Sequence, residues 1–142
     1  MASASDYLET RILDFFLKNN SLSTSAPNPI YVALFTGDPT DSAGLTDFAN
    51  EVSTSGSSNY ARTQVSFGTI DTQGGTVSNS GAVTFPVAGA NYNGTVTHVA
   101  IVDNATAGSG NILFHGALSD NKTVETNDTF QINAGQLTVT IA

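Results

Sequence analysis

The chain of 142 residues contains no cysteine. This absence excludes disulfide bridges, thiolate nucleophiles and zinc sites with thiolate ligands. A domain of this size buries roughly 70% of the surface of its unfolded chain, so it can fold around one hydrophobic core without cross-links. The length therefore predicts a single domain that spans residues 1–142.

Basic residues are scarce. Four Lys and Arg stand against twelve Asp and Glu, which gives a formal net charge of −8. The four basic residues are scattered along the chain: Arg11, Lys18, Arg62 and Lys122. Because nucleic-acid binding depends on clustered positive charge, the sequence predicts no direct contact with nucleic acid.

Tryptophan and long apolar runs are also missing. No run approaches the ~20 apolar residues of a membrane helix, so no membrane partner is expected. Residues 1–6 lack the basic and apolar regions of a signal peptide, which predicts a soluble protein made in the cytoplasm. Without tryptophan and with only four tyrosines, an aromatic platform for sugars is disfavoured.

The second half of the chain, residues 60–142, alternates apolar and polar residues between Gly and Asn turns. The clearest runs cover residues 95–103, 111–118 and 136–141. In the last run the apolar and polar side chains fall on opposite faces of a strand. They are Leu137, Val139 and Ile141 on one face, and Thr138 and Thr140 on the other.

Shorter signals complete the predicted fold. The apolar, β-branched run 30–36 indicates a buried strand, and Gln73-Gly74-Gly75 indicates a hairpin turn. Short strands separated by turns about every 8–15 residues are typical of a sandwich or barrel. The prediction is a mainly β protein: an antiparallel, jelly-roll-like β-sandwich over residues 30–142, preceded by one N-terminal α-helix.

The helix is predicted over residues 6–19. Asp6 is the expected N-cap, and Glu9 occupies the position of a capping-box acid. Large apolar side chains recur at i, i+4, i+7 and i+8, which places them on one stripe of the helix. They are Leu8, Ile12, Phe15 and Phe16.

This apolar stripe needs a cover, because each large side chain left in water forgoes about 1.5–3 kcal/mol. We expect the helix to flank its own β-sandwich, since most helical stability comes from tertiary packing. Docking on a neighbouring subunit fits the same stripe. The sequence leaves both possibilities open.

Residues 41–59 form a long segment without periodicity, and such segments are usually functional or disordered. If the segment is ordered, Leu45 and Phe48 are its expected anchors. It is a candidate for contact with a partner, and a mobile surface loop is equally consistent with its composition.

Candidate catalytic and metal-binding residues are few. His98 and His115 lie on predicted neighbouring strands, but their spacing supplies no third metal ligand. The acidic groups around Asp38 and around Asp120 do not match a calcium-binding loop and are interpreted as solvated turn carboxylates. No serine lies in a Gly-x-Ser-x-Gly motif, and no glycine-rich phosphate loop follows a strand. The sequence predicts a non-enzyme with no metal and no cofactor.

A series of short segments is distinctive as a set. They are 31–36 (Tyr-Val-Ala-Leu-Phe-Thr) with 38–40 (Asp-Pro-Thr), 60–62 (Tyr-Ala-Arg), 83–86 (Val-Thr-Phe-Pro), 96–98 (Val-Thr-His), 116–118 (Gly-Ala-Leu) and 135–139 (Gly-Gln-Leu-Thr-Val). Together they resemble a family of small virion proteins of tailed bacteriophages, whose members are described as tail-fibre-like, capsid decoration or cement proteins. The resemblance covers most of the chain and implies a virion structural protein with no catalytic residues.

The first hypothesis is a capsid decoration or cement protein of the virion. A homo-oligomer, expected to be a trimer, would sit over junctions of the major capsid protein and stabilise the head. Its partner-binding residues would be Leu8, Ile12, Phe15, Phe16, Tyr31, Phe35, Leu45 and Phe48.

Two further hypotheses are weighed against it. A tail fibre or tail-tip module would bind a host surface glycan through aromatic side chains such as Tyr60 or Tyr92. A hydrolase of cell-wall or capsular sugar would need a pair of carboxylates that the sequence does not identify.

Overall fold

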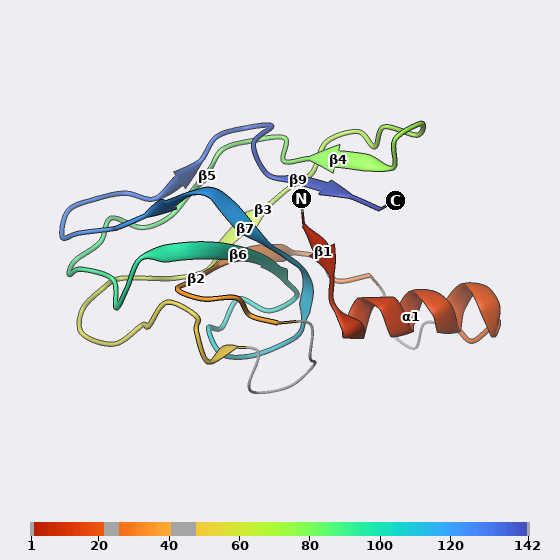
Figure 1. Cartoon of the computed structure of the whole chain (residues 1–142), viewed down its shortest axis with the longest axis horizontal. Helices are drawn as coiled ribbons and strands as arrows, with labels where there is room; N and C mark the ends of the chain where they lie inside the picture. Colours follow the sequence, from red (N-terminus) through yellow and green to blue (C-terminus); the bar gives the residue numbers. More distant parts are fainter. Residues whose placement is uncertain (1, 22–25, 41–47, 142) are drawn as a thin grey trace.

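The computed structural model describes residues 2–21, 26–40 and 48–141. Its elements are β1 (Ser3–Ala4), α1 (Asp6–Leu17), β2 (Ile30–Phe35), β3 (Thr63–Val65), β4 (Thr76–Ser78), β5 (Val83–Thr84), β6 (Val96–Val102), β7 (Ile112–Lys122), β8 (Gln131–Ile132) and β9 (Thr138–Thr140). The prediction of a mainly β, antiparallel protein with one N-terminal helix is confirmed (Figure 1).

Five strands form the main sheet, in the order β1-β7-β6-β2-β3. All its pairings are antiparallel; in the central one, Leu34 of β2 lies opposite Val99 of β6. The second layer consists of two short ribbons, β4–β9 and β5–β8, which lie above the main sheet in Figure 1.

Side chains alternate across the central strands and build a core on each face of the main sheet. In β2, Val32 and Leu34 point into the larger cluster, which also contains residues of β5 and β9. Ala33 and Phe35 point into a smaller cluster on the opposite face. All four are fully buried, so β2 is buried on both faces, as its continuous apolar run predicts.

Helix α1 begins at residue 6, as predicted, but its N-cap lies one residue before the predicted cap. Ser5 is the N-cap and its hydroxyl accepts a hydrogen bond from the backbone N–H of Leu8 at 3.4 Å. The prediction of Asp6 as cap is wrong, and Glu9 therefore stands one position beyond the capping-box site. The helix ends at Leu17 rather than at residue 19, where Asn19 has a φ of 53° that cannot continue it.

The expectation that the sandwich covers the helix is correct only for the first turns. Tyr7 and Leu8 pack at the edge of the larger core cluster, and β7 is the main strand in contact with α1. The last two turns project away from the β body (Figure 1). Their exposed apolar side chains are Leu13 (53% exposed), Phe15 (44%), Phe16 (73%) and Leu17 (77%).

The structure describes the predicted long loop, residues 41–59, from residue 48 onwards. Residues 41–47, including the predicted anchor Leu45, lie outside the described residues. From residue 48 onwards the segment is ordered against the sheet: Val52 is buried, and its N–H donates to the carbonyl of Leu34 at 2.9 Å. Within the described ranges, the structure contains no helix long and apolar enough to cross a membrane.

Candidate functional site

The most exposed apolar surface of the described residues is the end of α1, which we call the helix tip and define as Leu13, Phe15, Phe16 and Leu17. Phe15 and Phe16 pack edge to face, with ring centroids 4.9 Å apart. Four large apolar side chains exposed at one end of a helix make this end a candidate contact surface. Of the four helix residues predicted to bind a partner, Phe15 and Phe16 are therefore exposed, and Leu8 and Ile12 are half-buried.

The base of the helix is firmly attached to the β body. The backbone N–H of Ser5 donates to the carbonyl of Leu113 at 3.0 Å, and the Ser5 hydroxyl donates to the carbonyl of Ile112. Ser5 is itself buried. These bonds fix the direction in which α1 leaves the sheet, so the helix tip is presented in a defined orientation.

A groove of about 930 Å³ opens on the β body between the second half of β7 and the strands β8 and β9. Leu118 and Ile132 line it as half-buried apolar residues, together with the buried Phe130. Two carboxylates, Asp120 and Asp128, also line it. The sequence did not predict the groove. Periodicity locates strands, but it does not show that the segments that form the walls of the groove lie close together.

The remaining predicted partner-binding residues belong largely to the interior. Phe35 is fully buried, which makes it a core residue and removes it from the accessible surface. Tyr31 is half-buried and packs against the smaller core cluster. Phe48, the described anchor of the loop, stacks on Phe35 with ring centroids 6.4 Å apart.

A buried ion pair holds the loop that Phe48 begins. The Nε and Nη2 atoms of Arg62 donate to Oε1 and Oε2 of Glu51 at 2.7 and 2.8 Å. The Arg62 guanidinium also lies over the Phe48 ring, 4.8 Å from its centroid. Glu51 and Arg62 side chains are 4% and 0% exposed. Sequence reasoning missed this pair, since the scattered Arg62 had no visible partner.

Hydrogen bonds satisfy the other groups of this ion pair. The Nη1 atom of Arg62 donates to the carbonyls of Asn104 and Ser109, at 2.7 and 2.8 Å. Glu51 also accepts from the Tyr60 hydroxyl at 3.0 Å and from the Gly108 N–H at 2.8 Å. The network joins two loops to the sheet, so we assign it a role in the fold.

The tyrosines suggested for glycan binding are buried. Tyr60 and Tyr92 are 4% and 6% exposed and pack edge to face in the larger core cluster. Burial, and secondarily the Glu51 carboxylate, raises the pKa of Tyr60; burial raises the pKa of Tyr92. Neither ring offers a face to a sugar, so the prediction that they bind glycan is wrong.

The histidines lie on neighbouring strands, as predicted. His115 of β7 is opposite Ala100 of β6, two positions along from His98. The Nδ1 atom of His115 is 3.6 Å from a carboxylate oxygen of Asp38, and the Nδ1 atom of His98 is 2.9 Å from the Thr97 hydroxyl. No group of three His, Asp or Glu side chains close enough to hold a metal occurs in the part of the chain that the structure describes.

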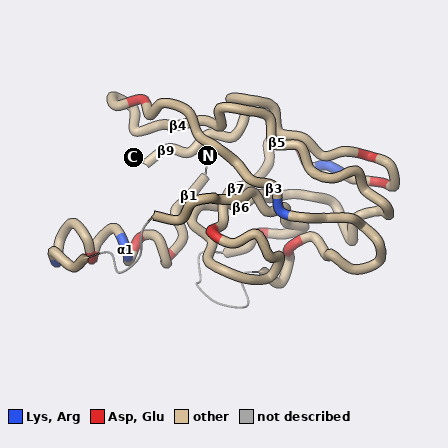
Figure 2. Tube along the Cα trace, turned by 180° about the vertical axis from the view of Figure 1, so that it is seen from behind, with Lys and Arg blue, Asp and Glu red and all other residues tan. Residues whose placement is uncertain are grey.

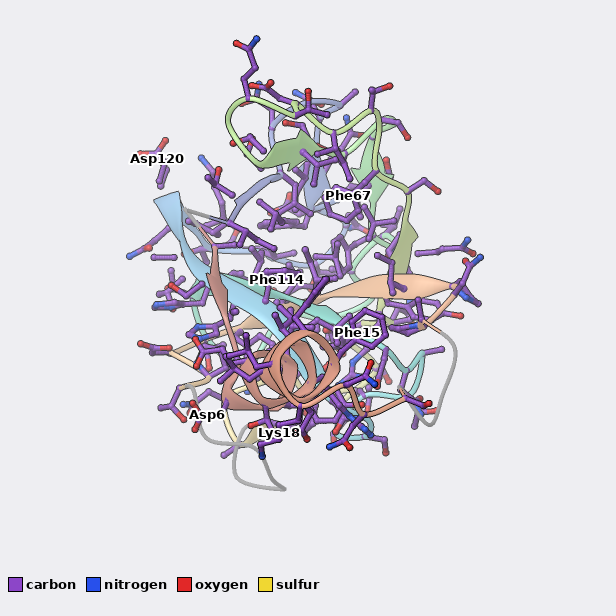
Figure 3. All side chains as sticks on the ribbon, turned by 90° about the vertical axis from the view of Figure 1, so that its right-hand side faces the viewer. Asp6, Phe15, Lys18, Phe67, Phe114 and Asp120 are labelled. Carbon is purple, nitrogen blue, oxygen red and sulfur yellow. The ribbon has the colours of Figure 1, made fainter. Side chains whose placement is uncertain are left out.

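Charge is unevenly distributed over the molecule. Helix α1 carries both signs (Figure 2), whereas most acidic residues of the described β body lie on loops and Asp120 lies on β7 (Figure 3). Lys18, at the end of the helix, pairs with Asp14 at 3.1 Å, and Arg11 lies over the Tyr7 ring. With Arg62 buried, the basic residues left for the surface are these two and Lys122.

The model of the family described as "Podophage GP4 fiber I protein gp80" matches residues 3–140. No curated protein matches the chain.

Proposed function

The chain belongs to the podophage GP4 fiber I protein family, and we propose that it is a structural subunit of a podophage tail fibre. The observation that carries the proposal is the extent of the match. It begins at residue 3 and ends at residue 140, so it includes α1 and the whole β body. The family is one of phage virion structural proteins, in agreement with the resemblance found in the sequence.

The geometry supports a role in assembly. The β body has a firmly attached helix whose tip exposes Phe16 and Leu17, a surface that gains stability when another protein covers it. In a particle built from many copies, individually weak contacts of this kind add up to stable attachment. An assembled structural subunit therefore fits both the family and the surface.

Placement on the tail is preferred over capsid decoration. The description of the family names a fibre, and the sequence hypothesis of a cement protein over capsid junctions has no comparable support. A fibre that binds host glycan through Tyr60 or Tyr92 is disfavoured, because both rings are buried.

The proposal is tested by locating the protein on the particle. Purified virions of the phage that encodes this chain would be labelled with a gold-conjugated antibody against it and imaged by electron microscopy. We expect gold on the tail and none on the head. Label spread over the head surface would overturn the proposal in favour of capsid decoration.

Particles assembled without this chain provide the control. They should carry no gold, lack a tail appendage, and keep heads that withstand heating as well as those of complete virions. Heads that rupture at a lower temperature than those of complete virions would identify a cement protein instead.

A further inference from the structure

We propose that Asn93 is a site of spontaneous deamidation, at which the side-chain amide is lost as ammonia and the residue becomes aspartate or isoaspartate. Asn93 is exposed and stands in the turn that leads into β6. This strand begins at the end of the β body far from α1 (Figure 1). The inference goes beyond the proposed function, because the reaction needs only this turn and water, wherever in the virion the protein stands.

The sequence of the turn favours ring closure. Asn93 is followed by Gly94, and this is the only Asn-Gly pair in the chain. In deamidation the backbone nitrogen of the following residue bonds to the side-chain Cγ of the asparagine. Glycine has no Cβ to obstruct this approach and has the widest range of backbone angles, so it brings the nitrogen to Cγ most easily.

The attacking nitrogen is not held by the fold. Among the residues that the structure describes, the N–H of Gly94 donates to no acceptor. A backbone N–H that is hydrogen-bonded within the protein has to give up that bond before its nitrogen can attack, which raises the barrier. Gly94 has no such bond to give up.

The group under attack is held by a hydrogen-bond donor. The backbone N–H of Ser53 donates to Oδ1 of Asn93 at 2.9 Å. Attack at Cγ places negative charge on this oxygen, so the donor already lies on the atom that becomes an oxyanion. Ser53 is itself fixed, because its carbonyl accepts from the hydroxyl of Ser58 at 2.7 Å. The donor is therefore in place before the reaction begins.

The reaction balances without an oxidant or a reductant. A buffer base takes the proton of the Gly94 nitrogen, whose electron pair forms the new bond to Cγ. The bond from Cγ to Nδ2 then breaks, and the amide nitrogen takes a proton from the buffer and leaves as ammonia. Water next opens the five-membered succinimide. Opening at Cγ gives aspartate, and opening at the backbone carbonyl gives isoaspartate, whose main chain is longer by one methylene group.

The longer main chain would disturb the contacts of the turn. Gly94 lies against the residue that follows β2, since a Cβ at position 94 would be only 3.2 Å from Cγ2 of Thr36. Asn93 also holds the loop that begins at residue 48, through its bond with Ser53. Isoaspartate therefore shifts the turn against both segments. Each product also adds one negative charge to a chain whose net charge is −8.

Asn91 is a matched control in the same chain. It is also exposed, and its Oδ1 also accepts from a backbone N–H, that of Thr126 at 2.8 Å. The next residue, however, is the buried Tyr92, whose N–H donates to the carbonyl of Val124 at 3.0 Å. The nitrogen that would attack is already engaged, so we expect Asn91 to react much more slowly than Asn93.

The first test is peptide mapping by mass spectrometry, applied to the purified full-length protein during storage in warm, mildly alkaline buffer. We expect conversion at Asn93 to be at least about tenfold faster than at Asn91, and to accelerate with rising pH because the attacking nitrogen must lose its proton. Fragmentation by electron transfer would distinguish isoaspartate from aspartate. Equal rates at the two residues, or no conversion at Asn93, would overturn the proposal.

Unfolding in urea separates the effect of the turn from that of the Asn-Gly pair. Asn91 should then react faster, because the N–H of Tyr92 is released, whereas the rate at Asn93 should change little. Strong acceleration at Asn93 would show that the folded turn protects the amide, and would refute the proposal.

The variant Asn93→Gln links the reaction to stability. Its ring closure needs a six-membered ring, so position 93 should stay unmodified and the melting temperature should hold during storage, whereas that of the wild type should decline. An equal decline in both proteins would exclude Asn93 as the cause. These measurements use purified protein, so they stand or fall independently of where gold label appears on the virion.

Discussion

At the scale of single residues, the ion pair of Glu51 and Arg62 holds two loops against the sheet. A buried pair costs desolvation energy, and here each of the two side chains makes four hydrogen bonds, which offset that cost. The pair therefore contributes to the stability of the fold mainly because both charges and their hydrogen bonds are present together. Removing one partner leaves the other charge buried and uncompensated.

We expect Arg62→Met to lower the free energy of unfolding by about 3–5 kcal/mol, because Glu51 then loses its counter-ion. The double variant Arg62→Met with Glu51→Leu should recover part of this loss. Lys18→Met serves as control: it removes the exposed pair with Asp14 and should cost about 0.5 kcal/mol or less. Urea denaturation measures all three, and equal effects of Arg62→Met and Lys18→Met would contradict the interpretation.

Two buried tyrosines allow a second comparison. The Tyr92 hydroxyl is buried without a hydrogen-bond partner among the described residues, whereas the Tyr60 hydroxyl accepts from the Leu34 N–H and donates to Glu51. We expect Tyr92→Phe to leave stability unchanged or raise it by about 1–2 kcal/mol, and Tyr60→Phe to lower it by about 1–3 kcal/mol. Thermal unfolding would show the difference, and a larger loss for Tyr92→Phe would refute it.

The same tyrosines predict sensitivity to alkali. Burial raises the pKa of both Tyr60 and Tyr92, so the folded state holds them neutral at a pH where the unfolded chain ionises them. Their contribution is fully present below the unfolded pKa of about 10 and declines as the pH rises above it. Urea midpoints should therefore fall between about pH 9 and about pH 11. Tyr92→Phe should fall less steeply, and an identical slope would argue against the assignment.

At the scale of elements, the sequence predicted what depends on periodicity. Alternation located β6 and the final strand β9, and a continuous apolar run located β2. The spacing of Leu8, Ile12 and Phe15 located α1. The sequence assigned the N-cap of α1 to the wrong residue. Ser5 and Asp6 are both good caps, and only the hydrogen bonds made by Ser5 distinguish them.

Contacts between distant segments could not be predicted from the sequence. The partner of Arg62 lies in an aperiodic stretch, and strands as short as β5 and β8 carry too few residues to show alternation. The apolar stripe identified one face of α1, but it did not identify the surface that packs against this face. That is why the sequence could not decide between packing on the body and docking on another subunit, and why it missed the groove.

At the scale of the whole molecule, α1 and the β body differ in what stabilises them. Every buried hydrophobic residue of the described chain lies at Val32 or later, and within residues 2–18 only the polar Ser5 is buried. Tyr7 and Leu8 contribute to the core only as half-buried side chains at its edge. The body should therefore fold without the helix, whereas an isolated helix of twelve residues is marginal in water.

A variant without residues 1–18 tests this division. We expect it to unfold cooperatively, with a free energy of unfolding lower by roughly 2–3 kcal/mol, because it loses the half-buried side chains of Ala2, Tyr7 and Leu8 and the short pairing of β1 with β7. Circular dichroism should show the helical signal lost and the β signal kept; Leu13→Asp in the full chain should keep both. Gradual, non-cooperative unfolding of the truncated chain would mean that α1 is part of the core, and the exposed tip would then be a consequence of folding rather than a surface kept for assembly.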